Sequence, residues 1–263
     1  MEDLLKKTLM NLQKMYFDSQ DKVREFKRDW DDIRFTNGRK RHDINVTAAL
    51  IYLYKHYDMN FGLLDNFLSS GKINNPGFQN TMKAYIHEEY IRKFISHNAH
   101  YVEDFLLGIA LFYDEQKLYR EDGAREDNES LNNLLEELVD CNSLKECSFL
   151  QGNANPGRIL VDMVSRMPSL NYTAYAIHPD LMVVLQLRLL LLQIIQQDMK
   201  SGGVIQPKDI VENQLFDRIL TMPLWRPSSK AMEYFPERTS LSKLDVPESK
   251  IADGEWHEIL FNL

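Results

Sequence analysis

Apolar residues recur at steps of three and four along residues 2–35, the spacing that places them on one face of an α-helix. Charged side chains fill the other faces, and the pattern has one gap near Ser19. We therefore expect one long N-terminal helix. Its apolar seam consists of Leu5, Leu9, Leu12, Tyr16, Val23, Phe26, Trp30 and Ile33.

Two interpretations of this seam stay open. The seam packs across the helix's own domain, or it forms a coiled coil with another chain and makes the protein a homo-oligomer. The Tyr, Phe and Trp side chains favour packing within the domain, because they are bulkier than the side chains of a typical two-stranded seam.

The first helix is expected to end at Asn37-Gly38, because Gly readily adopts the left-handed conformation that follows many helices. Asp43 is expected to cap the next helix. The apolar period predicts further helices over residues 44–60, 61–70, 78–98, 100–119, 129–140, 158–167, 178–201 and 207–222. Loops are expected at residues 70–77, 120–127 and 150–157. No stretch alternates with period two for long enough to predict a strand.

These patterns predict an all-α fold, either a multi-helix bundle or a short helical solenoid of about eight to ten helices. The helix over residues 178–201 is apolar almost all round and should lie in the centre of the fold. Its most apolar part, residues 181–195, is shorter than a membrane span and contains Arg188, so we expect no span.

The domain organisation follows from where the helical period stops. We expect a single all-α domain over residues 1–222, with a subdivision near residues 120–128 or 150–157. Residues 223–263 contain frequent Pro and no period, which predicts an irregular tail. The last apolar patch predicts that this tail docks through residues 255–263.

Composition places the chain among ordinary globular proteins, with 263 residues, 44% hydrophobic residues and a formal net charge of −8. The negative charge argues against a protein that coats nucleic acid with an excess of cations, although a local basic patch remains compatible with binding. The two cysteines, Cys141 and Cys147, are too few for a structural zinc site. The N-terminus has no apolar segment typical of a signal peptide. We expect a reduced intracellular protein, cytoplasmic or nuclear.

Common catalytic and nucleotide-binding motifs are missing from the sequence, including GxGxxG, GxxxxGK[ST], GxSxG and HExxH. His97, His100 and Asp104 have a spacing that would put them on one helical face, but no fourth metal ligand can be named. We read them as a polar helix surface and expect neither a metal nor a cofactor.

The segment Arg92 to His97, RKFISH, resembles the R-x4-6-H motif of the HEPN ribonucleases. The match covers two residues of one helix, and the residue after the Arg is Lys93 where these proteins often have a polar residue. The resemblance implies that Arg92 would hold the scissile phosphate and that His97 would act as general acid or base.

The most basic short stretch is NGRKRHD, residues 37–43. Arg34, Arg39, Lys40 and Arg41 are candidate phosphate contacts, and Phe35 could stack on a base. The simpler interpretation is that cations at a helix C-terminus complement its dipole and keep a loop soluble.

The tail contains candidate partner-binding residues, Trp225, Trp256, Leu260 and Phe261. Aromatic residues in an irregular segment usually anchor it to a surface, either of its own domain or of a partner.

The sequence therefore predicts a non-enzymatic intracellular interaction or scaffold protein that acts through protein–protein contacts and self-association. A nucleic-acid-binding structural protein, similar to a viral nucleoprotein or matrix protein, is the first alternative, with RNA bound at the basic stretch. A HEPN-like ribonuclease that uses Arg92 and His97 is the second.

Overall fold

The computed structural model describes residues 2–38, 43–70, 76–113, 148–152, 172–174, 179–196, 204–205 and 218–221, with Gly157 and residues 160–161 and 163–164. The chain divides into two compact units. Unit 1 contains Asp3–Asp114 and Gln186–Ile195, and unit 2 contains Glu115–Leu185 and Gln196–Leu263. Each unit is described by itself below. The described residues are predominantly helical, which confirms the predicted all-α class and a helical bundle.

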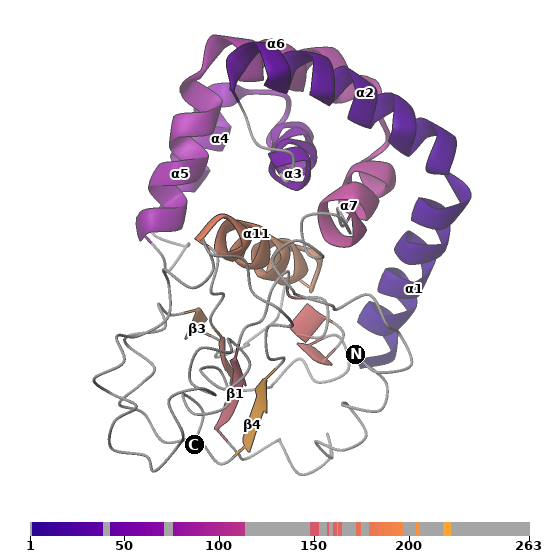
Figure 1. The fold of residues 1–263 in the computed structure, drawn as a ribbon, viewed down its shortest axis with the longest axis vertical. Coiled ribbons are helices and arrows are strands. Elements are labelled where there is room, and N and C mark those ends of the chain that lie inside the picture. Colours follow the sequence, from indigo (N-terminus) through magenta and orange to yellow (C-terminus); the bar gives the residue numbers. More distant parts are fainter. Residues whose placement is uncertain are drawn as a thin grey trace, which may run out of the picture. The chain divides into compact units, whose positions relative to one another are not determined.

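Unit 1 is built from helices (Figure 1). In chain order they are α1 (Glu2–Asp18), α2 (Gln20–Asn37), α3 (Asp43–His56), α4 (Phe61–Ser69), α5 (Pro76–His87), α6 (Glu89–His97), the short 3-10 helix η1 (Asn98–His100) and α7 (Glu103–Phe112). The second half of α11 (Pro179–Gln196) completes the unit.

The predicted N-terminal helix is present, but it is interrupted at Ser19, so that α1 and α2 run at an angle to each other (Figure 1). The interruption coincides with the gap in the apolar seam. The predicted end of this region is confirmed, since Gly38 has a φ of 66° and its N–H donates to the carbonyl of Arg34.

The seam of α1 and α2 is buried inside unit 1, which confirms the interpretation that it packs on its own domain. Phe26 lies 5.6 Å from the ring centres of both Phe94 and Tyr101, and Trp30 lies 5.4 Å from Phe94. The buried seam residues are Leu5, Leu9, Leu12, Tyr16, Val23, Phe26 and Trp30. A coiled coil through the same seam would have to pull these side chains out of the core.

α1 approaches α7 closely at Gly108. A Cβ atom at that position would lie 3.2 Å from Cβ of Tyr16. The missing side chain therefore lets the two helices pack at a distance that a larger residue would increase.

α3 is the central helix of unit 1, and Figure 1 views it nearly along its axis. Every residue from Asp43 to Leu53 is buried. The burial extends around the whole circumference of the helix, because α7 packs along it on one side and other helices surround the rest.

Two buried side chains cap the C-terminal end of α7. Nδ2 of Asn45, on α3, donates to the carbonyl oxygens of Ile109, Ala110 and Tyr113 at 3.2, 3.3 and 2.7 Å. Nη2 of Arg188, on α11, donates to the carbonyl oxygen of Tyr113 at 3.3 Å, and Arg188 is 0% exposed. These donors satisfy carbonyls that have no partner within the helix, and the Arg charge is favourable at the negative end of the helix dipole.

α11 begins at Pro179, as predicted, and its centre is buried as predicted. No helix in the part of the chain that the structure describes is long and apolar enough to cross a membrane.

Unit 2 contains a small parallel sheet that the sequence did not predict. Its strands are β1 (Phe149–Gly152), β2 (Tyr172–Ala174), β3 (Val204–Ile205) and β4 (Arg218–Thr221), in the order β3-β2-β1-β4. β1 overlaps the loop predicted at 150–157 and β4 lies within the helix predicted over 207–222, so both predictions were wrong there. Strands of two to four residues are too short to display a period of two.

Replacing Asn45 tests the cap of α7. We expect Asn45→Ala to lower the free energy of unfolding by about 1–3 kcal/mol, because it leaves buried carbonyls without a donor. Asn45→Asp should cost more at neutral pH, since it adds a buried carboxylate among carbonyl oxygens. Urea denaturation of both variants at neutral and acidic pH measures the difference.

The loss of stability caused by Asn45→Asp should increase with pH. Burial raises the folded-state pKa of an introduced carboxyl above its unfolded value, so its penalty is smallest at low pH and grows as the pH rises through the folded-state pKa. Asn66→Asp, at an exposed position of α4, is the matched control and should be nearly neutral. Equal losses for the two Asn→Asp variants would contradict a cap by Asn45.

Candidate functional site

α6 presents a continuous polar face. Ile91, Phe94 and Ile95 are buried against the rest of unit 1. The residues at complementary helical positions are therefore turned outward. This polar face consists of Glu89, Arg92, Lys93, Ser96 and His97.

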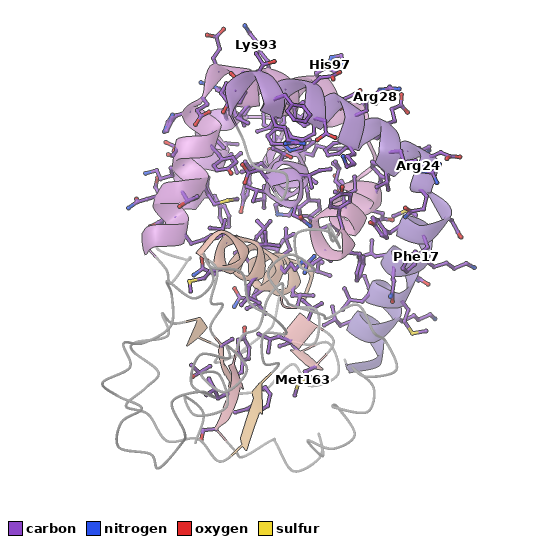
Figure 2. The ribbon with its side chains drawn as sticks, in the orientation of Figure 1. Phe17, Arg24, Arg28, Lys93, His97 and Met163 are labelled. Carbon is purple, nitrogen blue, oxygen red and sulfur yellow. The ribbon has the colours of Figure 1, made fainter. Side chains whose placement is uncertain are left out.

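The polar face of α6 lines an open pocket of about 660 Å³ together with Phe61, the first residue of α4. We call this the α6 pocket. Arg92 and His97, which the sequence singled out as a pair, therefore share one pocket. Figure 2 shows Lys93 and His97 projecting from the outer side of α6.

Arg92 rests on an aromatic support. Its Cζ atom lies 4.4 Å from the ring centre of Phe61. The ring of Tyr54 lies 4.3 Å from the same centre, tilted by 30°. Tyr54 and Arg92 therefore both contact the ring of Phe61. The cation–π contact holds the guanidinium group at the pocket wall.

The two cations of the α6 pocket differ in their partners. Nζ of Lys93 lies 2.6 Å from Glu89, and this hydrogen bond and charge lower the pKa of the Glu89 carboxyl. Both side chains are largely exposed, so the pair contributes little to stability. Among the residues that the structure describes, no carboxylate forms an ion pair with Arg92.

The set His97, His100 and Asp104 does not form a metal site. Nδ1 of His100 donates to the carbonyl oxygen of His97 at 2.9 Å, and the two imidazole rings are 6.4 Å apart. Asp104 lies on the following helix, α7. Within the described residues, no group of three His, Cys, Asp or Glu side chains is arranged to hold a metal ion.

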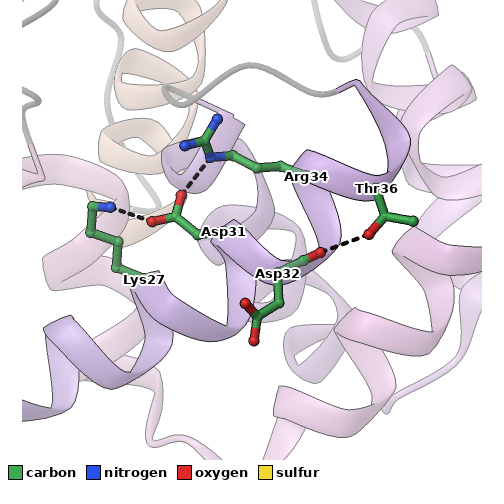
Figure 3. Close-up of polar contacts among 5 residues, drawn as sticks. All are labelled: Lys27, Asp31, Asp32, Arg34 and Thr36. Atoms are coloured by element: carbon green, nitrogen blue, oxygen red, sulfur yellow. Dashed lines mark hydrogen bonds and ion pairs between the residues drawn. The ribbon is translucent and has the colours of Figure 1, made fainter.

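Arg34, the first of the candidate phosphate contacts, is directed into unit 1. It is 6% exposed, and its Nε donates to Asp31, which also accepts a hydrogen bond from Lys27 (Figure 3). Its Cζ lies 4.0 Å from the ring centre of Phe35. Arg34 therefore makes its side-chain contacts within the C-terminal part of α2. The other candidates, Arg39, Lys40, Arg41, Trp225, Trp256, Leu260 and Phe261, lie outside the described residues.

Asp31 is held in its charged form by these cations. Burial raises the pKa of Asp31, but the hydrogen bonds and charges of Lys27 and Arg34 outweigh burial and bring the pKa below its ordinary value of 3.8.

α1 has an exposed face opposite the buried seam, with two large apolar side chains on it. Met10 is 60% exposed and Phe17 is 56% exposed; Figure 2 labels Phe17 near the end of α1. Their spacing of seven residues places them on one side of the helix. The outer face of α1 consists of Lys7, Met10, Asn11, Lys14, Phe17 and Asp18.

In the sheet of unit 2, the direction in which successive strands are added changes at β1. From β1 the chain adds β2 and β3 on one side, and β4 pairs with the other side of β1. The carboxyl ends of β1 and β4, at Gly152 and Thr221, are paired residues at the same edge of the sheet.

Comparison of the chain with protein-family models finds no matching family, and comparisons with curated proteins and with solved structures find no match either.

Sequence reasoning named Arg92 and His97 as a candidate pair but did not name Phe61 or Tyr54 beside them. No sequence signal connects Phe61 with Arg92, because their contact joins separate helices 31 positions apart.

Asp31→Asn tests the role of the buried ion pair. We expect it to lower the free energy of unfolding by about 1–3 kcal/mol at neutral pH, because the nearly buried Arg34 loses its charged partner. The folded-state pKa of Asp31 is lowered, so its stabilisation is present above pH 3.8 and is lost as the pH falls through the folded-state value. Denaturation curves of both proteins should therefore converge in acid. Asp32→Asn, at the exposed neighbouring position, should change stability little; an equal loss there would argue against this pair.

Proposed function

We propose that the protein is a non-enzymatic helical interaction protein that associates with copies of itself through the outer face of α1. The observation that carries this proposal is the exposure of Met10 and Phe17 on the side of α1 that the core does not use. Because the seam is occupied within unit 1, self-association through α1 would use the outer face.

A second copy of α1 in antiparallel orientation complements this face. If Met10 of one copy faces Phe17 of the other, a twofold axis passes between residues 13 and 14 of both helices. Lys7 then lies about 3 Å along the helix axis from the position of Asp18 in the second copy, within reach of an ion pair. Such an interface is self-complementary, as a twofold dimer requires. A single helix pair is a small interface, so weak association is expected.

Charge substitutions test this interface. We expect Phe17→Glu, and likewise Met10→Glu, to weaken self-association at least about tenfold, because each replaces an apolar contact between the two copies with a charge. Lys7→Glu and Asp18→Lys should each weaken it, and the double variant should recover it, since both ion pairs are then reversed. Sedimentation equilibrium over a concentration series measures each dissociation constant.

Phe35→Glu is the matched control, since Phe35 is 70% exposed at the end of α2 and lies off the outer face of α1. It should leave association unchanged. A wild-type protein that stays monomeric at high micromolar concentration, or a double variant that associates no better than the single ones, would refute the proposed dimer.

We infer a second candidate function, binding of a nucleotide-type small ligand, for unit 2. The observation that favours it is the parallel order β3-β2-β1-β4. In open parallel sheets, ligands bind outside the carboxyl ends of the strands where the strand order reverses. In unit 2 this position lies beside Gly152 and Thr221. The inference rests on topology, since one fold serves many functions.

Gly152→Arg tests this second candidate. Gly152 is the last residue of β1, so we expect a large side chain there to obstruct a ligand at the carboxyl edge of the sheet. We expect the wild-type chain to bind at least one of adenosine, ATP, NAD and S-adenosylmethionine in isothermal titration calorimetry, and Gly152→Arg to lose that binding. Ser148→Arg, at the amino end of β1, is the control and should retain it. No heat with any of the four probes, or equal loss in the two variants, would count against the site.

The remaining expectations stay predictions. Binding of RNA at Arg39, Lys40 and Arg41 concerns residues outside those described. A HEPN-like ribonuclease would need Arg92 and His97 at one phosphate, and their common position at the α6 pocket is compatible with that requirement. A cytoplasmic or nuclear location, and a protein partner at the tail, are likewise proposals.

A further inference from the structure

We propose that the α6 pocket binds the phosphate groups of a single-stranded nucleic acid, through backbone contacts that do not depend on base sequence. The proposal goes beyond self-association through α1 and beyond the ligand of unit 2. It uses residues of α6 and α4 in unit 1, and it requires no cleavage of the strand.

Arg92 carries the main part of the argument. A guanidinium group binds phosphate oxygens with two parallel N–H donors, and orienting it beforehand reduces the entropy lost on binding. The contact of Arg92 with Phe61, at 4.4 Å, provides that orientation, and Phe61 is itself held by Tyr54 at 4.3 Å between ring centres. Arg92 also gives up no ion pair within the described residues when a phosphate arrives.

The neighbours of Arg92 add donors of the type that phosphate accepts. Lys93 adds a cation, Ser96 adds a hydroxyl group, and His97 adds a ring N–H, all on the wall of the same pocket. Glu89 is the acidic residue on that wall, and it is paired with Lys93 at 2.6 Å. An exposed pair of this kind is weak and readily exchanges its carboxylate for a phosphate.

The shape of the pocket indicates a polymer. Sites for small ligands usually enclose most of the ligand surface, whereas the α6 pocket is open along the side of one helix. A phosphate that belongs to a longer strand needs no such enclosure. Phe61 is already in contact with Tyr54 and Arg92, so we expect recognition through the nucleic-acid backbone rather than through stacking of a base.

Further cations extend the surface along α2. In the view of Figure 2, Lys93, His97, Arg28 and Arg24 follow the outer edge of unit 1. α2 packs directly on α6 through the contact between Phe26 and Phe94. Arg24 and Arg28 are paired with Asp21 and Asp29, and these pairs are largely exposed. They can therefore turn to a passing strand at little cost.

The charge of the chain is unevenly distributed, which removes the main objection to a polyanionic ligand. Residues 1–113 contain 16 Lys and Arg against 15 Asp and Glu, whereas residues 114–263 contain 15 against 24. The negative net charge of the protein therefore does not arise in the segment that contains α6.

Fluorescence anisotropy with a labelled single-stranded oligouridylate and the full-length chain tests the proposal. We expect salt-sensitive binding by the wild type. Arg92→Ala should weaken binding at least about tenfold and reduce the slope of log affinity against log salt by about one. Arg92→Lys should recover only part of the affinity, because it restores the charge without the two parallel donors. Lys83→Ala, a partly exposed cation on α5 outside both proposed surfaces, is the control and should stay within about twofold of the wild type.

Two further variants separate binding from folding. Phe61→Leu keeps an apolar residue but removes the aromatic support of Arg92, and it should weaken binding while Arg92 is still present. Glu89→Gln should strengthen binding about threefold, because it frees Lys93 and removes a negative charge. A gain in affinity is the opposite of what loss of the folded α6 pocket would give. A wild type that does not bind at low salt, an Arg92→Ala variant that resembles Lys83→Ala, or a Glu89→Gln variant without a gain would overturn the proposal.

The source of the phosphate is tested by competition. Unlabelled oligothymidylate should displace the labelled strand as effectively as oligouridylate, as expected for backbone recognition. Displacement by inorganic phosphate or uridine monophosphate at the same phosphate concentration would overturn the assignment to a polymer.

Discussion

The structure of unit 1 depends on how the end of α7 is satisfied. Because α7 is buried from Phe105 to Leu111, its last carbonyls are surrounded by packed side chains and need donors from the protein. Asn45 and Arg188 supply them from α3 and α11. Apolar packing alone would allow these helices to slide or rotate, whereas a buried donor that must meet particular carbonyls fixes their register. The apolar contacts around this cap then form in one arrangement.

The aromatic contacts between α2 and α6 determine which face of α6 is exposed. Phe94 contacts both Phe26 and Trp30, so the rotation of α6 about its own axis is set by the aromatic core. Once that side is buried, the remaining positions of the helical repeat must be exposed. The α6 pocket is thus a consequence of core packing in the N-terminal helices, combined with the position of Phe61 at the start of α4. The backbone positions of its residues are set by α6 and α4, although all its polar residues lie at the surface.

The features that the sequence predicted correctly depend on interactions between residues within one or two helical turns of each other. The seam of α1 and α2, the end at Gly38 and the start of α11 at Pro179 are of this kind. The pair of Asp31 and Arg34 could also have been found, since they are three residues apart on one helix, but Arg34 was grouped with the basic stretch instead. The contact of Phe61 with Arg92 and the pairing of β1 with β4 join distant segments. No local pattern encodes them, because tertiary packing decides which distant residues meet.

The net charge of the chain does not indicate which surface can bind an anion, because it too ignores which residues lie close together. The formal charge of −8 is a sum over the whole chain, whereas a bound phosphate senses charges within about 8–10 Å at physiological salt. Within that range, the ion-pair partners of each cation influence phosphate binding more than the net charge of the whole chain does. Lys93, Arg24 and Arg28 must exchange a carboxylate for a ligand, whereas Arg92 has no ion pair among the described residues and stays in contact with the ring of Phe61. A single oriented guanidinium can therefore dominate recognition on a protein that is acidic overall, provided that the acidic residues lie elsewhere or are already paired.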